Sequence, residues 1–171
     1  MGRCSHRCLA LAASVTAGLL VAACGFQPLY GSRADGSSAS HALASVSVVE
    51  QPTRLGQLIR NELLSTMAPA GVQQTEQYVL ELLPAAAEEV AIRDFDTGVL
   101  RRSFRVEAAF RLIESGSGSE LYSGRTFSQA SYDRTSTPFA DLQARITAEE
   151  RAAKEVGADI ATRLAAFFAS R

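Results

Sequence analysis

Residues 100–112 constrain the fold more strongly than any other segment, because apolar and polar side chains alternate along it. The mainly apolar set is Leu100, Arg102, Phe104, Val106, Ala108, Phe110 and Leu112, and the polar set includes Arg101, Ser103, Arg105, Glu107 and Arg111. A period of two is typical of a β-strand with one buried face and one face open to water. The rest of the chain must therefore supply apolar elements that cover one face of a sheet.

Weaker alternating patterns predict three further strands. Residues 44–48 alternate between apolar residues and serine, and residues 78–82 repeat the pattern with larger apolar side chains. Pro84 is expected at a sheet edge or a bulge, with the strand continuing through residues 90–92. Residues 121–132 carry the least regular pattern, after a Gly/Ser-rich loop that is typical of a hairpin.

Two segments repeat apolar residues at helical spacing. The first begins after Thr53, which can cap it, and ends before residues 69–71. The second begins near Thr137 and Pro138, and Gly157 lowers its helix propensity by roughly 1 kcal/mol. Its apolar stripe is interpreted as a core face, with a partner surface as the alternative. The stripes are Leu55, Leu58, Ile59, Leu63 and Met67 in the first segment, and Leu142, Ile146, Ala153, Val156, Ile160, Leu164 and Phe167 in the second.

These elements predict an α+β fold in the order β-α-β-β-β-α over residues 43–171. The architecture expected is a two-layer sandwich, in which a four-stranded, mostly antiparallel sheet has two helices on one face. This arrangement buries every apolar stripe. It leaves the face that carries Arg101, Arg105 and Arg111 open.

The N-terminus has the features of an export signal. Arg3, His6 and Arg7 precede an apolar run over residues 9–22, which is shorter than the ~20 residues that a helix needs to cross a bilayer. All three cysteines lie in the first 24 residues, so the remainder can hold neither a disulfide nor a cysteine metal site. Residues 1–23 are therefore interpreted as a signal peptide.

The signal ends in Val-Ala-Ala-Cys-Gly over residues 21–25, which resembles the lipobox of bacterial lipoproteins. That resemblance implies cleavage before Cys24 and a covalent diacylglycerol and N-acyl lipid on Cys24, with no other cofactor. Gly25, in place of aspartate, implies an outer-membrane destination. The alternative from the residues alone is a plain secretory signal with a chance cysteine.

Residues 24–31, with the sequence CGFQPLYG, resemble the start of the mature LPS-assembly lipoproteins of the LptE family, in their alphaproteobacterial form. The predicted element order is also that of this family. The physical alternative is an apolar tether at the membrane surface, within a lipidated and flexible segment over residues 24–42. The resemblance implies a non-catalytic protein that plugs an LptD-like β-barrel, helps it assemble and delivers lipopolysaccharide, with its domain in the periplasm or the barrel lumen.

No catalytic pattern is found. His41 is the only histidine after cleavage, no metal-ligand spacing is present, and Asp94 and Asp96 fit a solvated turn better than a carboxylate pair. The net charge of −1 gives no reason to expect nucleic-acid binding. We therefore expect neither an enzyme nor a metal site.

The arginines of residues 100–112 are the candidate binding site. Guanidinium groups bind phosphate bidentately, so Arg101, Arg105 and Arg111 are hypothesised to contact lipopolysaccharide phosphate. The alternative is an ordinary solvated strand face in which Glu107 pairs across to an arginine. Two rival functions stay open at this point: an auxiliary lipoprotein of another envelope lipid-transport system, and a periplasmic hydrolase, for which the catalytic residues are lacking.

Overall fold

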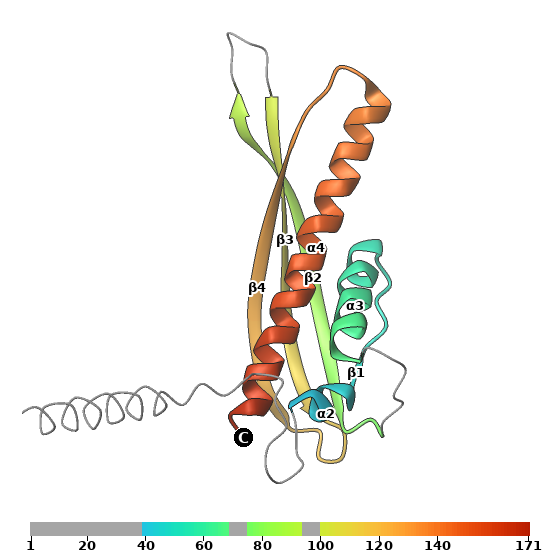
Figure 1. The fold of residues 1–171 in the computed structure, drawn as a ribbon, viewed down its shortest axis with the longest axis vertical. Helices are drawn as coiled ribbons and strands as arrows, with labels where there is room; N and C mark the ends of the chain where they lie inside the picture. The colour runs from blue at the N-terminus through green and yellow to red at the C-terminus, as the bar shows by residue number, and fades with distance from the viewer. Residues whose placement is uncertain (1–38, 69–74, 94–99) are drawn as a thin grey trace, which may run out of the picture.

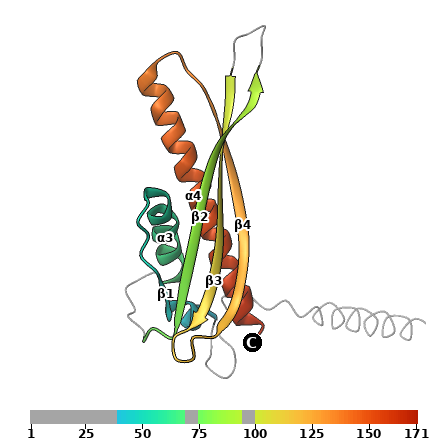
Figure 2. The same ribbon diagram turned by 180° about the vertical axis from the view of Figure 1, so that it is seen from behind.

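The structure is a computed structural model that describes residues 39–68, 75–93 and 100–171. The strands form one long, twisted sheet, and the helices lie against one of its faces (Figures 1 and 2). This arrangement confirms the predicted α+β fold. The described elements are α2 (Ala39–Ala44), β1 (Val46–Val48), α3 (Arg54–Met67), β2 (Tyr78–Arg93), β3 (Leu100–Glu114), β4 (Glu120–Asp133) and α4 (Pro138–Ala169).

Several predictions concern residues outside these ranges. They are the signal peptide over residues 1–23, the lipidated Cys24, the linker as far as residue 38, the helix stop at residues 69–71 and the turn with Asp94 and Asp96. Within the described part of the chain, no helix is both long and apolar enough to cross a membrane.

The sheet is mixed, in the order β1-β2-β3-β4. β1 runs parallel to β2, whereas β2–β3 and β3–β4 are antiparallel, which confirms the mostly antiparallel prediction. β2 is one continuous strand through Pro84, which lies at the sheet edge beyond the reach of β1, as one of its two predicted positions; the irregularity lies between Val90 and Ile92. The three central strands are therefore long, while β1 pairs only with Tyr78, Val79 and Leu80.

The start of the domain differs from the prediction. Residues 39–44 form the short helix α2, which the sequence pattern did not indicate, so Ala44 is helical and β1 is only three residues long. Leu43 and Ala39 of α2 are both buried in the core. The helix places these two apolar side chains on one side, which the strand pattern of residues 44–48 obscured.

The core lies between the sheet and α4. The even-numbered side chains of β3 are buried from Phe104 to Leu112, as the alternation predicts. The facing side of α4 is rich in alanine, which lets the helix backbone lie close to the strands. The fully buried residues of α4 are Ala148, Ala152, Ala153, Val156, Ile160, Ala161, Leu164 and Ala165.

The core interpretation is wrong at the start of α4. Leu142 is 48% exposed and the neighbouring Phe139 is 72% exposed. Burial begins only at Ala148, because α3 is short and does not extend alongside the first turns of α4 (Figure 1). The apolar stripe of α4 therefore extends past the elements that bury the rest of the helix.

Local capping agrees with the sequence at one helix and differs at the other. The Thr53 hydroxyl accepts a hydrogen bond from the Gly56 amide at 3.1 Å, which confirms its role as the N-cap of α3. Thr137 occupies the N-cap position of α4, but its side chain makes no capping hydrogen bond. Pro138 at the first helical position provides the start signal there.

Gly157 marks the closest approach of α3 to α4. A β-carbon at this position would lie 2.9 Å from Cβ of Glu62 and 3.2 Å from the carbonyl oxygen of Ile59. The lack of a side chain at Gly157 therefore allows α3 and α4 to cross at short distance, in addition to lowering the helix propensity of α4.

Substituting Gly157 with alanine tests this interpretation. We expect Gly157→Ala to lower the free energy of unfolding by about 1–3 kcal/mol, because the overlap with the α3 backbone outweighs the gain in helix propensity. Chemical denaturation of the domain measures the change. Ala158→Gly at the adjacent exposed position is the control and should cost only about 1 kcal/mol. Stabilisation by Gly157→Ala would contradict the packing argument.

Candidate functional site

The predicted arginines lie on the sheet face opposite the helices, because they alternate along β3 with the buried even-numbered side chains. Figure 2 views the sheet from this side. Arg101 pairs with Asp133, its neighbour on β4, through contacts of 2.8 Å and 3.3 Å. Arg111 donates to Glu81, its neighbour on β2, at 2.5 Å. The predicted open face is thus confirmed, but these two arginines already have carboxylate partners.

The three arginines do not converge on one site. Arg101 and Arg111 are ten positions apart on one strand, which corresponds to about 33 Å. The hydrogen bond to Asp133 raises the pKa of Arg101, and the same bond lowers the pKa of Asp133. Both pairs are largely exposed, so their net contribution to stability is small.

Arg105 has a different environment. Its guanidinium carbon lies 3.9 Å from the centroid of the Phe127 ring, which is a cation–π contact. Its Nε lies 3.9 Å from the Oε2 atom of Glu107. The expected pairing of Glu107 across to an arginine does not occur, because its neighbours on the adjacent strands are Ala85 and Phe127; its ion pair in the described ranges is with Arg105 of the same strand. Arg105 retains donors for another anion.

Arg125 belongs to the same face, and the sequence reasoning missed it. Its pairing partner on β3 is Ala109, so it shares the odd-numbered side of the sheet with Arg105. It is exposed and forms no ion pair with any residue in the described ranges. The two-residue spacing of Arg125 and Phe127 was the available signal, but the irregular β4 pattern concealed it.

Apolar side chains occupy the middle of this face. Leu83 is 75% exposed and Phe127 is 58% exposed, with small alanines at positions 85, 87 and 109 between them. The ion pairs of Arg101 and Arg111 lie towards the two ends. We name this surface, with its central apolar residues and flanking arginines, the open face.

A second polar cluster lies on the helix side of the sheet. Glu88 accepts hydrogen bonds from Arg102 at 2.8 Å, from Arg145 of α4 at 3.1 Å and from the Tyr132 hydroxyl. The hydrogen bonds from Tyr132 and Arg102 lower the pKa of Glu88. Burial and the bond to Glu88 raise the pKa of Tyr132 to about 12. This cluster joins β2, β3, β4 and α4.

Arg102 shares the mainly apolar side of residues 100–112, and the alternation pattern predicted no partner for it. The residue is half-buried, and Glu88 neutralises it. An arginine at a strand position that faces the core implies a nearby carboxylate. Identifying which one requires the register between β2 and β3, which the alternation pattern alone does not provide.

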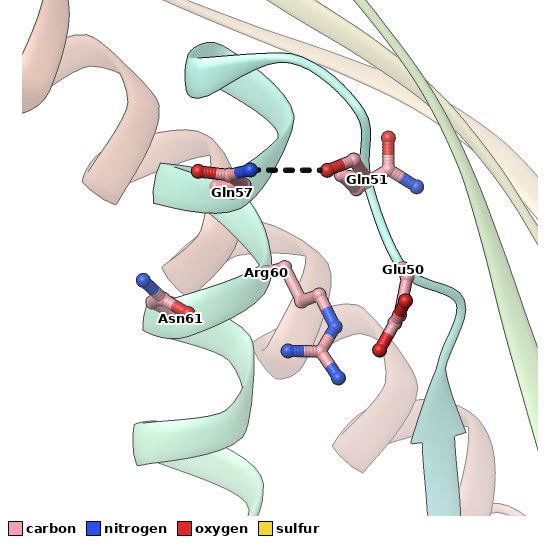
Figure 3. A pocket seen from close by; sticks show the side chains of 5 residues that line it. All are labelled: Glu50, Gln51, Gln57, Arg60 and Asn61. Atoms are coloured by element: carbon pink, nitrogen blue, oxygen red, sulfur yellow. Dashed lines mark hydrogen bonds between the residues drawn. The ribbon is translucent and has the colours of Figure 1, made fainter.

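A polar pocket of about 340 Å³ lies between α3 and the segment that follows β1 (Figure 3). Arg60 donates through Nε to the carbonyl oxygen of Val48 at 3.2 Å, and the Gln57 amide donates to the carbonyl oxygen of Gln51 at 3.4 Å. Glu50 and Asn61 complete the lining. These groups can hydrogen-bond a polar ligand, but they include no nucleophile beside a base.

His41 lies in α2 rather than in an extended linker. Across the described ranges, no group of three or more histidine, cysteine, aspartate or glutamate side chains is arranged to hold a metal ion. The open face, with its exposed apolar residues and the donors of Arg105, is the principal candidate for function, as a binding surface.

No family model and no curated protein matches this chain. Solved structures do resemble it. A proposed lipoprotein from Caulobacter crescentus CB15 is 25% identical with a TM-score of 0.65, and the match covers 78% of this chain and 97% of that one. A minor lipoprotein from Acinetobacter baumannii is 13% identical with a TM-score of 0.51, covering 71% and 88% respectively, and shows the fold alone.

Rare lipoprotein B from Shewanella oneidensis is 19% identical with a TM-score of 0.46, covering 73% of this chain and 92% of its own, which is too low to establish a shared fold. The Caulobacter protein matches over nearly its whole length. Together with the Cys24 motif, this likeness supports a lipoprotein of the bacterial envelope.

The Glu88 cluster generates a pH-dependent prediction. Because folding lowers the pKa of Glu88 from its ordinary value of 4.5, its ionised form stabilises the fold above that pH. The contribution is lost as the pH falls through the lowered value. We expect Glu88→Gln to reduce the free energy of unfolding by about 1–3 kcal/mol at pH 7, measured by denaturant titration.

The difference between Glu88→Gln and the wild type should shrink as the pH falls below 4.5 and disappear at the pH where Glu88 becomes protonated in the folded protein. Asp133→Asn, which removes an exposed carboxylate from an ion pair of the same kind, should leave stability unchanged at either pH. Equal effects of the two substitutions at pH 7 would show that the Glu88 cluster is no stronger than a surface pair.

Proposed function

We propose that this protein is an outer-membrane lipoprotein that sits as a plug inside an LptD-like β-barrel, helps the barrel to assemble and assists delivery of lipopolysaccharide to the cell surface. Its role is non-catalytic. The observation that carries the proposal is the open face, a complete side of the sheet that the helices leave uncovered (Figure 2). The CGFQPLYG motif at residues 24–31 supplies the family resemblance.

The chemistry of the open face fits a barrel lumen. A lumen is largely polar and wet, so a plug needs hydrogen-bonding groups rather than a continuous apolar surface. The Arg101–Asp133 and Arg111–Glu81 pairs offer such groups with balanced charge. Leu83 and Phe127 add exposed apolar anchors near the centre, where interface residues contribute most to affinity.

Within this function, lipopolysaccharide is proposed to contact the arginines of the open face. Arg101, Arg105 and Arg111 are the original candidates, and Arg125 joins them. Arg105 and Arg125 are the stronger pair, because a phosphate bound there displaces no close carboxylate. At Arg101 and Arg111, Asp133 and Glu81 compete with the phosphate and repel it.

Isolation of the tagged, full-length lipoprotein from detergent-solubilised outer membranes tests the main proposal. We expect a large β-barrel protein in near-equal amount, because a plug and its barrel form a stable complex. Recovery with inner-membrane or soluble partners instead would favour an auxiliary lipoprotein of another envelope lipid-transport system. Recovery of no barrel in mild detergent would contradict the plug.

Binding of purified lipopolysaccharide to single-arginine variants tests the proposed contact. We expect Arg105→Gln and Arg125→Gln each to weaken binding about tenfold, the loss typical of one charge-assisted contact. Arg111→Gln removes the same charge from a residue that is already paired, and it should have a smaller effect. Equal losses in all three variants would indicate non-specific attraction to positive charge and would contradict the assignment.

A further inference from the structure

The upper part of β2 is an edge strand with no neighbour on one side. β1 covers only Tyr78, Val79 and Leu80. Beyond them, within the described residues, the only backbone hydrogen bonds made by β2 as far as Val90 are those to β3. Figure 1 shows β1 at one end of this long strand. We name residues 82–90 of this strand the β2 edge.

The direction of the free backbone groups follows from the paired end. The Tyr78 amide donates to the carbonyl oxygen of Ser45, and the Leu80 carbonyl oxygen accepts from the Val49 amide at 3.0 Å. Even-numbered residues therefore direct N–H and C=O away from β3, and this alternation continues to the irregularity after Val90. Pro84 is even-numbered, so its missing N–H costs no bond to β3.

Protection at the two long edges of the sheet is unequal. α4 protects the β4 edge at one point, where Arg151 donates to the carbonyl oxygen of Ser131. The β2 edge carries Pro84 and Glu89 but no such cover from a helix within the described residues, and Leu83, Val90 and the three alanines at positions 85–87 are exposed. Proteins normally shield a long, apolar edge because it pairs readily with another strand.

We propose that the β2 edge binds an extended segment of the barrel partner as an additional strand, a proposal that rests on the function given above. The strands of a closed barrel are already paired, so the segment must come from a loop or a terminus of that protein. Glu89 is exposed and has no ion pair among the described residues, so the segment that fits best carries a basic side chain opposite it.

A second copy of the chain fits this edge less well. Two-fold antiparallel pairing centred on Ala86 would place Pro84, which has no N–H, opposite Glu88 in the ladder. Pairing centred on Glu88 would bring two carboxylates face to face, which is unfavourable. A segment of different sequence avoids the facing carboxylates, and Pro84 then leaves one carbonyl of the ladder unpaired instead of two.

Proline at position 86 provides the test, because the Ala86 amide is directed away from β3. We expect Ala86→Pro to keep the thermal midpoint within about 2 °C of the wild type, as is usual for surface changes. In the outer-membrane isolation, it should recover about tenfold less barrel protein, because a partner carbonyl is left unsatisfied. Ala86→Ser, which retains the amide, should recover the wild-type amount.

Ala87→Pro is the folding control, because its amide is directed towards β3 and its loss should lower the thermal midpoint. An equal drop for Ala86→Pro would overturn the proposed edge geometry. Barrel recovery by the wild type and Ala86→Pro alike would overturn the edge proposal and leave the proposed function standing. If neither the wild type nor Ala86→Pro recovered a barrel protein, the edge proposal and the proposed function would both be overturned. A wild-type dimer that Ala86→Pro dissociates would identify a second copy as the occupant instead.

Discussion

The packing of α4 across the sheet is the contact on which the rest of the structure depends. Its alanine-rich face lies against the even-numbered side chains of β3, and Gly157 lets α3 pack closely beside it. Because every helix in the described ranges lies on this side, the opposite side of the sheet stays uncovered (Figure 2). The same helix also places Arg151 at the edge of β4, where it donates to the carbonyl oxygen of Ser131.

The two sides of the sheet consequently use charge in different ways. On the helix side, the half-buried Arg102 is neutralised by Glu88, within a cluster that holds α4 to three strands. On the open face, the ion pairs are exposed and contribute little to stability. The surfaces proposed to bind a partner, the open face and the β2 edge, are those that α4 leaves uncovered.

Much of this arrangement could be predicted from the spacing of apolar residues and from the residues that start helices. The alternation in β3 identified the buried and open sides, and Thr53 and Pro138 marked where α3 and α4 begin. Features that depend on the relative placement of elements could not be predicted. The Glu88–Arg102 contact requires the β2–β3 register, and the exposure of Leu142 depends on where α3 ends. The lipidation of Cys24 stays a prediction, since that residue lies outside the described ranges.

The burial of the open face in an assembly is the central claim, and thiol labelling measures it most directly. All natural cysteines lie within the first 24 residues, so Phe127→Cys introduces the only thiol of the folded domain. The rate of reaction with a maleimide can be compared between the isolated domain and the lipoprotein in outer membranes. The account predicts rapid labelling of the isolated domain and strong protection in the membrane. Equal rates in both would contradict an open face that is covered by a barrel.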